Sequence, residues 1–335
     1  MHPDTMRLID RWVGIPLCFF ASFWPLKKAQ ADSNSTLATN IPPPDTIVFI
    51  LIAEIGALVV AYPAIKETRK QHPKSRICFI TAPAGLQTLE LMGFEKEDIF
   101  LLETSSIKSL LKGIVNIRSH FKGKRVSAIV LEPFTRFSTL LSAWIGASKR
   151  IGCYRFLNEG VYLGNILTHR LVYNPHLHMS QTYFALAKAL IEPDSAKPLL
   201  KEYIPSQIKN RLKINIPEKE RQTLMKRLQS ECPENPLKKI ILLNANTSDI
   251  VPLRKWPLEN FVELGKQLLE NSEFTVVLTG SPEEKDVCVD LALQINPDRT
   301  VNFAGKTSFK ELITLYSISD LLITNDSGPV HFAST

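Results

Sequence analysis

The chain has 335 residues, of which 44% are hydrophobic and 8% aromatic, enough to form the cores of two domains of ordinary size. This composition excludes a chain that is disordered along its whole length. The 40 Lys and Arg residues against 33 Asp and Glu give a formal net charge of +7, which favours anionic partners such as phosphates or anionic lipid headgroups.

Residues 12–26 (WVGIPLCFFASFWPL) carry no charge, but the run is shorter than the roughly eighteen residues that span a bilayer. AQA at 29–31 resembles a signal-peptide cleavage site, yet acidic residues precede the apolar run and Lys27 and Lys28 follow it. We therefore predict that residues 1–45 form a retained segment at a membrane interface, with the two lysines near anionic lipid. The alternatives are a cleaved secretory signal and a segment packed on the protein body.

From residue 46, apolar strands alternate with helices. The run TIVFILIA at 46–53 is typical of a strand buried on both faces. Further strands are predicted at 76–81, 98–102 and 126–131, and helices at 56–69, 86–92, 107–121 and 138–145. Such alternation predicts a parallel sheet with helices on both faces, and ligands then bind at the carboxyl ends of the strands.

A proline-bearing, charged stretch at 191–237 interrupts this pattern, and we interpret it as the connection between a first domain at 46–190 and a second at 238–335. In the second domain, strands are predicted at 239–245, 274–280, 301–305 and 320–324, and helices at 258–270, 283–294 and 309–317. A short helix is predicted to begin near Gly328. Two Rossmann-like domains in tandem predict an active cleft between them.

The sequence lacks the patterns of common metal and nucleic-acid modules. The five cysteines never form a C-x-x-C pair, which indicates reduced thiols of a cytoplasmic protein. His176 and His178 are two residues apart, a poor spacing for two ligands on one helix face. No helix-turn-helix, ribonucleoprotein-like or Cys/His zinc pattern is present, so we predict neither nucleic-acid binding nor a metal site, and no feature indicates a cofactor.

The first of three polar stretches that follow predicted strands is NANTSDIVPLRKWP at 244–257. Thr247 and Ser248 offer hydroxyl and amide groups to a phosphate, while Arg254 and Lys255 supply positive charge. The alternative is a surface loop that leads into the next helix.

The second stretch, TGSPEE at 279–284, is a glycine turn that opens a helix. Glu283 and Glu284 stand in the first helical turn, where acidic side chains commonly interact with the helix dipole. The other reading is a carboxylate that binds a ribose.

The third stretch is TNDSGPVHFAST at 324–335. The amides at Ser327 and Gly328 are placed to hold a diphosphate at a helix start without side-chain charge. Asp326 caps that helix or orients a ligand, and His331 falls in its first or second turn. A lone D-S-G is common, and the order of all three stretches is more informative than any one.

Taken together, LRKWP…FVELGKQL, VVLTGSPEE and NFAGKTSFKELITLYSISDLLITNDSGPVHFAS closely resemble glycosyltransferase family 9, the ADP-heptose lipopolysaccharide heptosyltransferases and their relatives. In the first half, GALVVAYPAIKETRKQHPKSRICFIT, LLSAWIGASKRIG and HLHMSQTYFALAKAL are similar to the amino-terminal domain of that family. The resemblance covers about residues 46–335, and its final motif is the most specific part.

This resemblance implies an α/β fold of the GT-B type, in which an acceptor domain and a nucleotide-sugar domain face a cleft. It implies an inverting reaction without a metal, and the sequence has no D-x-D motif for a divalent ion. Arg254 or Lys255 would face phosphate, Glu284 or Glu283 the nucleoside, and Asp326, Ser327, Gly328 and His331 the donor diphosphate. The acceptor would be a phosphorylated glycolipid or lipopolysaccharide core, which implies a cytoplasmic enzyme peripheral to the inner face of the cytoplasmic membrane.

Two departures from the family pattern qualify this expectation. The family has Gly-Asp after its first strand, with the carboxylate as presumed base, whereas this chain has Gly56-Ala57. Glu54 and Glu132 are the candidate substitute bases; the alternative is an impaired or non-catalytic relative that still binds nucleotide-sugar or glycolipid. Family members also continue past the final motif with a further strand and helices, so we expect the second domain to be truncated. A GT-B sugar epimerase would fit the architecture but not the motifs.

Overall fold

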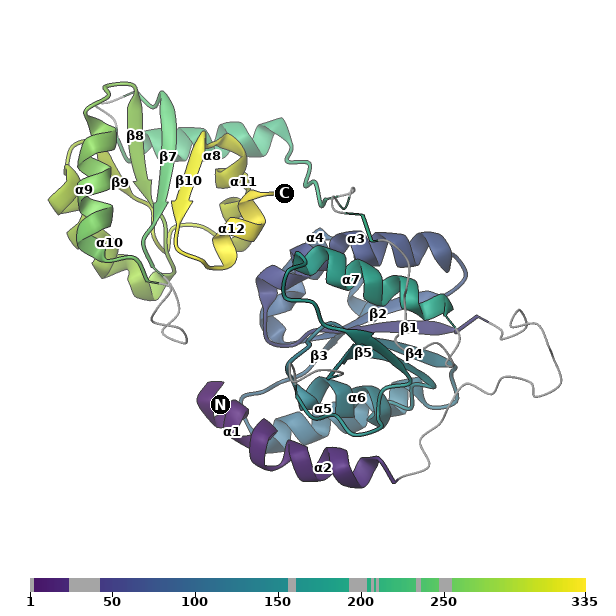
Figure 1. Ribbon diagram of the computed structural model, residues 1–335. Coiled ribbons are helices and arrows are strands. Elements are labelled where there is room, and N and C mark those ends of the chain that lie inside the picture. Colours follow the sequence, from purple (N-terminus) through teal and green to yellow (C-terminus); the bar gives the residue numbers. More distant parts are fainter. Residues whose placement is uncertain are drawn as a thin grey trace. The chain divides into compact units, whose positions relative to one another are not determined.

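The structure is a computed structural model that describes residues 3–23, 43–155, 161–192, 204–205, 208, 211–232, 236–246 and 255–335. It divides the chain into two compact units, Met1–Leu212 and Lys213–Thr335. Each unit is a parallel sheet with helices on both faces (Figure 1), which confirms the predicted α/β class.

The first unit contains a six-stranded sheet in the order β3-β2-β1-β4-β5-β6, with every neighbouring pair parallel. Its strands are β1 (Thr46–Ile50), β2 (Arg76–Thr81), β3 (Ile99–Leu101), β4 (Val126–Val130), β5 (Lys149–Tyr154) and β6 (His169–Val172). All five residues of β1 are buried, as its uninterrupted apolar sequence predicts for a central strand covered on both faces.

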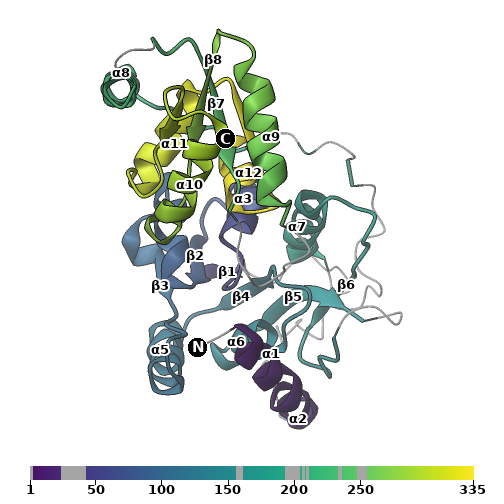
Figure 2. The ribbon, with the colours of Figure 1, turned by 90° about the vertical axis from the view of Figure 1, so that its left-hand side faces the viewer.

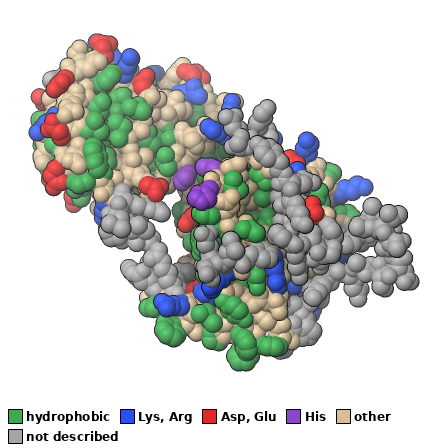
Figure 3. All heavy atoms as spheres, viewed as in Figure 1, with side chains coloured by type: hydrophobic (Ala, Val, Ile, Leu, Met, Phe, Trp, Pro, Cys, Tyr) green, Lys and Arg blue, Asp and Glu red, His purple; other side chains and the backbone are tan. Residues whose placement is uncertain are grey.

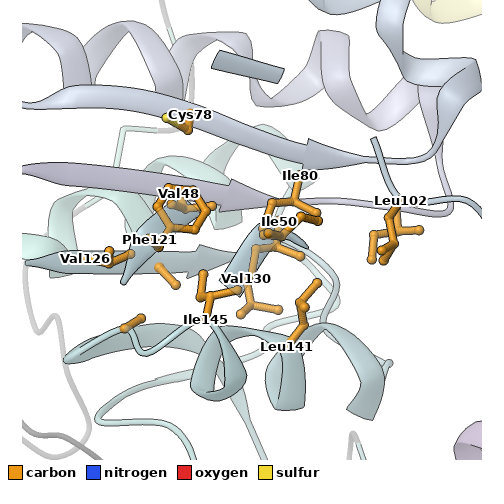
Figure 4. Close-up of a cluster of buried hydrophobic side chains, with 14 residues drawn as sticks. Val48, Ile50, Cys78, Ile80, Leu102, Phe121, Val126, Val130, Leu141 and Ile145 are labelled. Atoms are coloured by element: carbon orange, nitrogen blue, oxygen red, sulfur yellow. The ribbon is translucent and has the colours of Figure 1, made fainter. Parts of the chain in front are cut away.

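Two layers of helices cover this sheet. The helices are α3 (Ile55–Gln71), α4 (Leu86–Leu91), α5 (Ile107–Phe121), α6 (Arg136–Trp144) and α7 (Met179–Lys188), with short 3₁₀ turns η1 (Pro83–Gly85), η2 (Lys96–Asp98) and η3 (Ala189–Ile191). Figures 1 and 2 show α3, α4 and α7 on one face and α5 and α6 on the other. Figure 4 shows the core between the sheet and the layer formed by α5 and α6. Here Ile50 and Val130 of the sheet contact Phe121 and Leu141 of the helices. Burying each such side chain contributes about 1.5–3 kcal/mol.

A helical pair, α1 (Pro3–Trp12) and α2 (Gly14–Ala21), lies outside α6 on the same side of the sheet (Figures 1 and 2). The described part of the 1–45 segment therefore packs on the first unit. Among the described residues, no helix combines the length and the apolar character needed to cross a bilayer. Lys27 and Lys28, which were predicted to lie near anionic lipid, are outside the described residues.

The second unit has a four-stranded parallel sheet in the order β10-β7-β8-β9. Its strands are β7 (Lys239–Asn244), β8 (Phe274–Leu278), β9 (Thr300–Asn302) and β10 (Leu321–Thr324). Its helices are α8 (Glu218–Ser230), α9 (Leu258–Leu269), η5 (Pro282–Glu284), α10 (Lys285–Ile295), α11 (Phe309–Ile318) and α12 (Gly328–Ala333). In Figure 1, α9 and α10 cover one face, and α8, α11 and α12 lie on the other.

Candidate active site

In both sheets, the strands that follow the first strand in sequence are placed on both sides of it, so the strand order reverses at this first strand. In the first unit β1 lies between β2 and β4, and in the second unit β7 lies between β8 and β10. The connecting helices diverge at such a point, so the carboxyl ends of the two strands open a crevice where ligands of doubly wound sheets bind. The loops after β1, β4, β7 and β10 are therefore the first places to look for chemistry.

In the first unit, the side chain of Glu132 joins the loops that follow β4 and β1. Its Oε1 accepts hydrogen bonds from the backbone N–H groups of Ile52 at 3.0 Å and Ala53 at 2.8 Å. Its Oε2 accepts from the hydroxyl of Thr135 at 3.4 Å and from the hydroxyl of Ser138. Both oxygens of this predicted substitute base are thus engaged in holding the edge of the sheet together.

The other predicted base, Glu54, directly follows the loop that Glu132 holds. It is exposed and precedes α3 as its N-cap residue, but its side chain makes no capping hydrogen bond. Burial raises the pKa of the Tyr183 phenol, and the negative charges of Glu54 and Glu132 raise it further. The structure therefore brings both predicted carboxylates to the surroundings of Tyr183. Ala57, where the family has Asp, lies in the first turn of α3 with 9% of its surface exposed.

In the second unit, Asn325 joins the loops that follow β10 and β7. Its Oδ1 accepts from the backbone N–H of Trp256 at 2.9 Å, and its Nδ2 donates to the carbonyl oxygen of Ala245 at 2.7 Å. With 5% exposure, its amide is almost removed from water, so both bonds are costly to lose. The geometry repeats that of the first unit: a polar side chain after the second strand holds the loop after the first.

Asn244, the last residue of β7, connects this edge to β8. Its Nδ2 donates to the carbonyl oxygen of Thr279 at 3.3 Å and lies 3.2 Å from the Thr279 hydroxyl. Sequence reasoning did not single out Asn244, Asn325 or Tyr183. A signal existed for the two asparagines, because each stands at or just after the end of an apolar strand.

The structure describes part of the predicted phosphate loop after β7. Thr247, Ser248 and Arg254 lie outside the described residues. Lys255 is exposed and immediately precedes Trp256, whose backbone N–H is fixed by Asn325. The described end of the loop thus carries a lysine at the carboxyl edge of the sheet.

Glu283 and Glu284, the two residues predicted to bind the nucleoside, follow β8 in the turn η5. The Oε2 of Glu284 accepts from the backbone N–H of Ser281 at 2.7 Å, one half of a capping box. A hydrogen bond from the Ser281 side chain lowers the pKa of the exposed Glu283 carboxyl. Both glutamates therefore have a partner in Ser281: Glu284 accepts from its backbone N–H, and the exposed Glu283 carboxylate accepts from its side chain.

The predicted diphosphate loop follows β10. The Ser327 hydroxyl donates to the Asn325 carbonyl oxygen at 3.1 Å, and Gly328 begins α12, which has six residues. Asp326 precedes this pair, and His331 is half-buried within α12. Since so short a helix has little dipole of its own, any anion binding here has to come from local amides together with neighbouring loops.

Two other kinds of site receive less support. A hollow of about 180 Å³ in the second unit is lined by Lys238, Phe274 and Arg299, at the amino-terminal edge of the sheet. Arg299 there donates to three backbone carbonyl oxygens, which uses its guanidinium for structure. Within the described ranges, no three His, Cys, Asp or Glu side chains are grouped to hold a metal ion.

Comparison with known proteins gives a family match. The model of glycosyltransferase family 9 (heptosyltransferase) matches residues 127–335. Lipopolysaccharide heptosyltransferase 2 of Salmonella typhimurium is 31% identical over 86 residues, which cover 25% of this chain and 24% of that protein. Lipopolysaccharide core heptosyltransferase OpsX of Haemophilus influenzae is 22% identical over 295 residues, 87% of this chain and 76% of that protein.

Solved structures show the same fold at low sequence identity. E. coli ADP-heptose lps heptosyltransferase II has a TM-score of 0.62 at 19% identity, covering 86% of this chain and 81% of that one. A glycosyl transferase family 9 protein from Veillonella parvula has a TM-score of 0.65 at 20% identity, covering 86% and 77%. E. coli heptosyltransferase WaaC with ADP-2-deoxy-2-fluoro heptose has a TM-score of 0.59 at 14% identity, covering 86% of this chain and 85% of that one.

Proposed function

Because the chain belongs to glycosyltransferase family 9, we propose that it transfers a heptose-like sugar from a nucleotide-diphosphate donor to a lipopolysaccharide core or related envelope glycolipid. The donor class is taken from the E. coli relative that was solved with ADP-2-deoxy-2-fluoro heptose. The acceptor class is taken from the relatives that are named lipopolysaccharide heptosyltransferases. The match covers about a quarter of the first of these relatives, so activity and substrates are proposals for this chain.

One observation carries the proposal beyond the family match. Each sheet has a polar side chain, Glu132 or Asn325, that holds the loops together at the point where the strand order reverses. Such a bond fixes backbone amides and neighbouring side chains at the ligand-binding edge before a ligand arrives. Fixed groups of this kind stabilise developing charge without reorganising, which is what a transferase of a charged donor needs.

The proposed reaction is a single displacement that inverts the sugar. An acceptor hydroxyl forms a bond to the anomeric carbon while the bond from that carbon to the diphosphate oxygen breaks. The hydroxyl proton passes to a base, and the negative charge of the broken bond stays on the leaving nucleoside diphosphate. We propose that basic side chains and amides, rather than a metal ion, neutralise this charge.

We assign the donor to the carboxyl edge of the second unit. Lys255, with the predicted Arg254, Thr247 and Ser248, would face phosphate, and Glu283 or Glu284 would bind the nucleoside. Asp326, Ser327, Gly328 and His331 would surround the diphosphate. Of the two glutamates, Glu283 is the better ribose ligand because it is exposed, whereas Glu284 is half-buried and accepts from the Ser281 amide.

We assign the role of base to Glu54. Its carboxylate is exposed beside the anchored loop and makes no capping bond, whereas both oxygens of Glu132 are occupied. A specific observation favours the alternative of an impaired or non-catalytic relative that only binds nucleotide-sugar or glycolipid. Ala57 cannot accept a proton, and loss of a general base costs about 10²- to 10⁴-fold in rate.

The acceptor determines where the enzyme would work. A glycolipid of the envelope is made in the cytoplasmic leaflet of the inner membrane, so we place the protein in the cytoplasm at that membrane face. This location predicts a surface of the first unit that tolerates lipid.

Isothermal titration calorimetry with ADP, ADP-heptose and UDP tests the donor assignment first. We expect ADP and ADP-heptose to bind to the wild-type chain. The Ser327→Ala, Gly328→Val double variant should have an ADP affinity at least tenfold lower. Absence of heat with every nucleotide, from protein that melts cooperatively, would refute the assignment. A transfer assay with a phosphorylated core acceptor then separates the enzyme, which releases ADP, from the non-catalytic binder, which does not.

A further inference from the structure

The helical pair α1–α2 turns small and polar side chains toward the first unit. Asp10, Gly14, Cys18 and Ser22 recur every four residues and form one inward stripe. Cys18 and Gly14 are buried, and Asp10 and Ser22 are half-buried. A helix on the surface of a water-soluble domain normally shows the reverse arrangement, with its apolar side inward.

Specific contacts fix this stripe against the unit. Asp10 Oδ1 accepts from the backbone N–H groups of Arg136 and Phe137, both at 2.9 Å, and so caps α6 in place of its own N-cap residue, Thr135. Asp10 Oδ2 also pairs with the Arg136 guanidinium at 3.0 Å. At the other end, the Ser22 hydroxyl accepts from the backbone N–H of Asn165 at 2.9 Å. The helical pair is therefore held in one orientation.

Large apolar side chains occupy the outer side of the pair. This apolar face consists of Leu8, Trp12, Leu17, Phe19, Phe20 and Phe23. Trp12, Phe20 and Phe23 are 71%, 67% and 74% exposed. In Figure 3, hydrophobic side chains are exposed at the lower edge of the first unit, where α1 and α2 lie in Figure 1. So large a cluster on a folded surface marks a place where something apolar binds.

The helix α5 lies on the same side of the sheet as α1, α2 and α6 (Figures 1 and 2) and adds positive charge. Ile107, Leu111 and Val115 form an exposed stripe along it, each more than half exposed. Exposed Lys108 and Lys112 flank this stripe, and residues 104–131 contain six Lys and Arg and no Asp or Glu. The side of the unit that carries the apolar face is therefore also basic.

We propose that the apolar face is a docking surface for an anionic lipid bilayer, with its aromatic side chains in the headgroup region and the lysines of α5 near lipid phosphate. Aromatic rings prefer the interface between water and acyl chains, and each nearby lysine adds attraction to anionic lipid. A second copy of the chain is a poorer occupant, because pairing this side with itself brings like charges together. This inference rests on the proposed function for its purpose, since a docked first unit would meet a glycolipid acceptor in the bilayer.

Co-flotation of the full chain with vesicles tests the docking directly and requires no donor or acceptor. The vesicles contain either phosphatidylcholine alone or phosphatidylcholine with 30% phosphatidylglycerol, as a probe composition on the order of natural anionic content. We expect the anionic vesicles to bind the wild-type chain, and Phe20→Ser with Phe23→Ser to lower binding by about tenfold or more. Leu293→Ser, at a position 62% exposed on α10 of the second unit, is the matched control and should bind as wild type does.

Charge-reversal variants of α5 and a sedimentation measurement complete the test. Lys108→Glu with Lys112→Glu should weaken binding to anionic vesicles and leave binding to neutral vesicles unchanged. Equal flotation of wild type and the Phe20, Phe23 variant, with both melting alike, would overturn the proposal. A wild-type dimer in sedimentation that becomes a monomer in that variant, without flotation of either, would assign the face to a second copy instead.

The docking and the enzymatic proposals can fail separately. If the chain transfers sugar, the Phe20, Phe23 variant should keep its rate on a deacylated, water-soluble acceptor and lose rate on an acceptor held in vesicles. If the chain transfers nothing, flotation still decides the docking. Loss of both rates in a variant that floats normally would indicate a folding or active-site defect and contradict a docking role for these two residues.

Discussion

The Glu132 carboxylate, after β4, accepts the backbone N–H of Ala53, after β1, at 2.8 Å. With the bond from Ile52, it anchors the two residues that precede Glu54. We predict that Glu132→Gln keeps most of the transfer rate, because an amide oxygen still accepts both N–H groups. Glu132→Ala should lose most of the rate, and should lower the free energy of unfolding by about 1–3 kcal/mol, because it leaves these donors without a partner. Transfer assays and chemical denaturation measure the two effects.

The paired variants distinguish a positioning residue from a base. A base cannot be replaced by an amide, since an amide does not take a proton at neutral pH. If Glu132→Gln unfolds like wild type yet is as inactive as Glu132→Ala, Glu132 is the base and its positioning role is wrong.

Removing the proposed base should affect rate and not stability. Glu54→Gln is expected to lower transfer by about 10²- to 10⁴-fold, the usual cost of losing a general base. The melting temperature should stay unchanged, because the exposed side chain makes no capping bond. Glu103→Gln is the control, since Glu103 is exposed after β3, away from the point where the strand order reverses. Similar losses in both variants would remove Glu54 from the mechanism.

Adding the missing family carboxylate tests the alternative function. Ala57→Asp places a negative charge in the first turn of α3, where unpaired amides and the helix dipole favour it. If the chain is an impaired enzyme, the transfer rate should rise by at least tenfold. An unchanged rate in an active chain would support Glu54 as the base in use. No transfer before or after the change, with ADP still bound, would support a non-catalytic binder.

Much of the architecture could be predicted because its signals are local. The helix predicted at 107–121 has the same limits in the structure, and TIVFILIA contains β1, with the strand ending at Ile50 where its ladder to β2 ends. Sequence analysis did not assign β5, whose first residues are Lys149 and Arg150. Arg150 is only 1% exposed, and its guanidinium donates to the carbonyl oxygens of Ile166 and Ala147. In the sequence, two basic residues at the start of a strand resemble an exposed loop, because the carbonyl groups that satisfy the buried arginine are not part of the strand pattern.

Sequence analysis predicted the loop segments of the site but not the hydrogen bonds that join these loops. The stretches after β7, β8 and β10 were identified because each follows an apolar run, and the parallel sheet brings their starts to one edge. The hydrogen bonds between Glu132 and Ala53 and between Asn325 and Ala245 join residues about eighty positions apart, and no local pattern encodes them. The inward stripe of α1–α2 was also missed, because its apolar composition predicted an interface and gave no sign of Asp10 capping α6.

Breaking the Asn325 bridge should weaken donor binding through the backbone. Asn325→Asp keeps an acceptor for the Trp256 N–H but sets a carboxylate oxygen against the Ala245 carbonyl, which no longer accepts a hydrogen bond. We expect ADP affinity to fall by at least tenfold and the second unit to lose about 1–3 kcal/mol of stability. Calorimetry and denaturation measure both. Asn271→Asp, in a turn before β8, is the matched control, and equal ADP affinity in the Asn325 variant would show that the bridge does not shape the site.

Cys18 reports whether the helical pair is docked on the first unit. Burial raises the pKa of its thiol to about 12, so at pH 8 the native chain holds almost no Cys18 thiolate and should react slowly with a thiol reagent. Asp10→Ala removes the cap on α6 and the pair with Arg136, and should make Cys18 the fastest-reacting cysteine, as peptide mapping would identify. Asp10→Asn keeps an acceptor for the two N–H groups and should react at an intermediate rate.

The same thiol gives a pH dependence with a definite sign. The folded chain keeps the Cys18 proton up to about pH 12, while the unfolded chain releases it near the ordinary thiol pKa of 9.0. Its contribution to stability is therefore complete below about pH 9 and is lost as the pH rises toward 12. Cys18→Ala lacks this titration, so its melting temperature should fall less steeply over that range than that of the wild type. Parallel curves for the two proteins would mean that Cys18 is already in contact with water, and that the helical pair undocks before the unit unfolds.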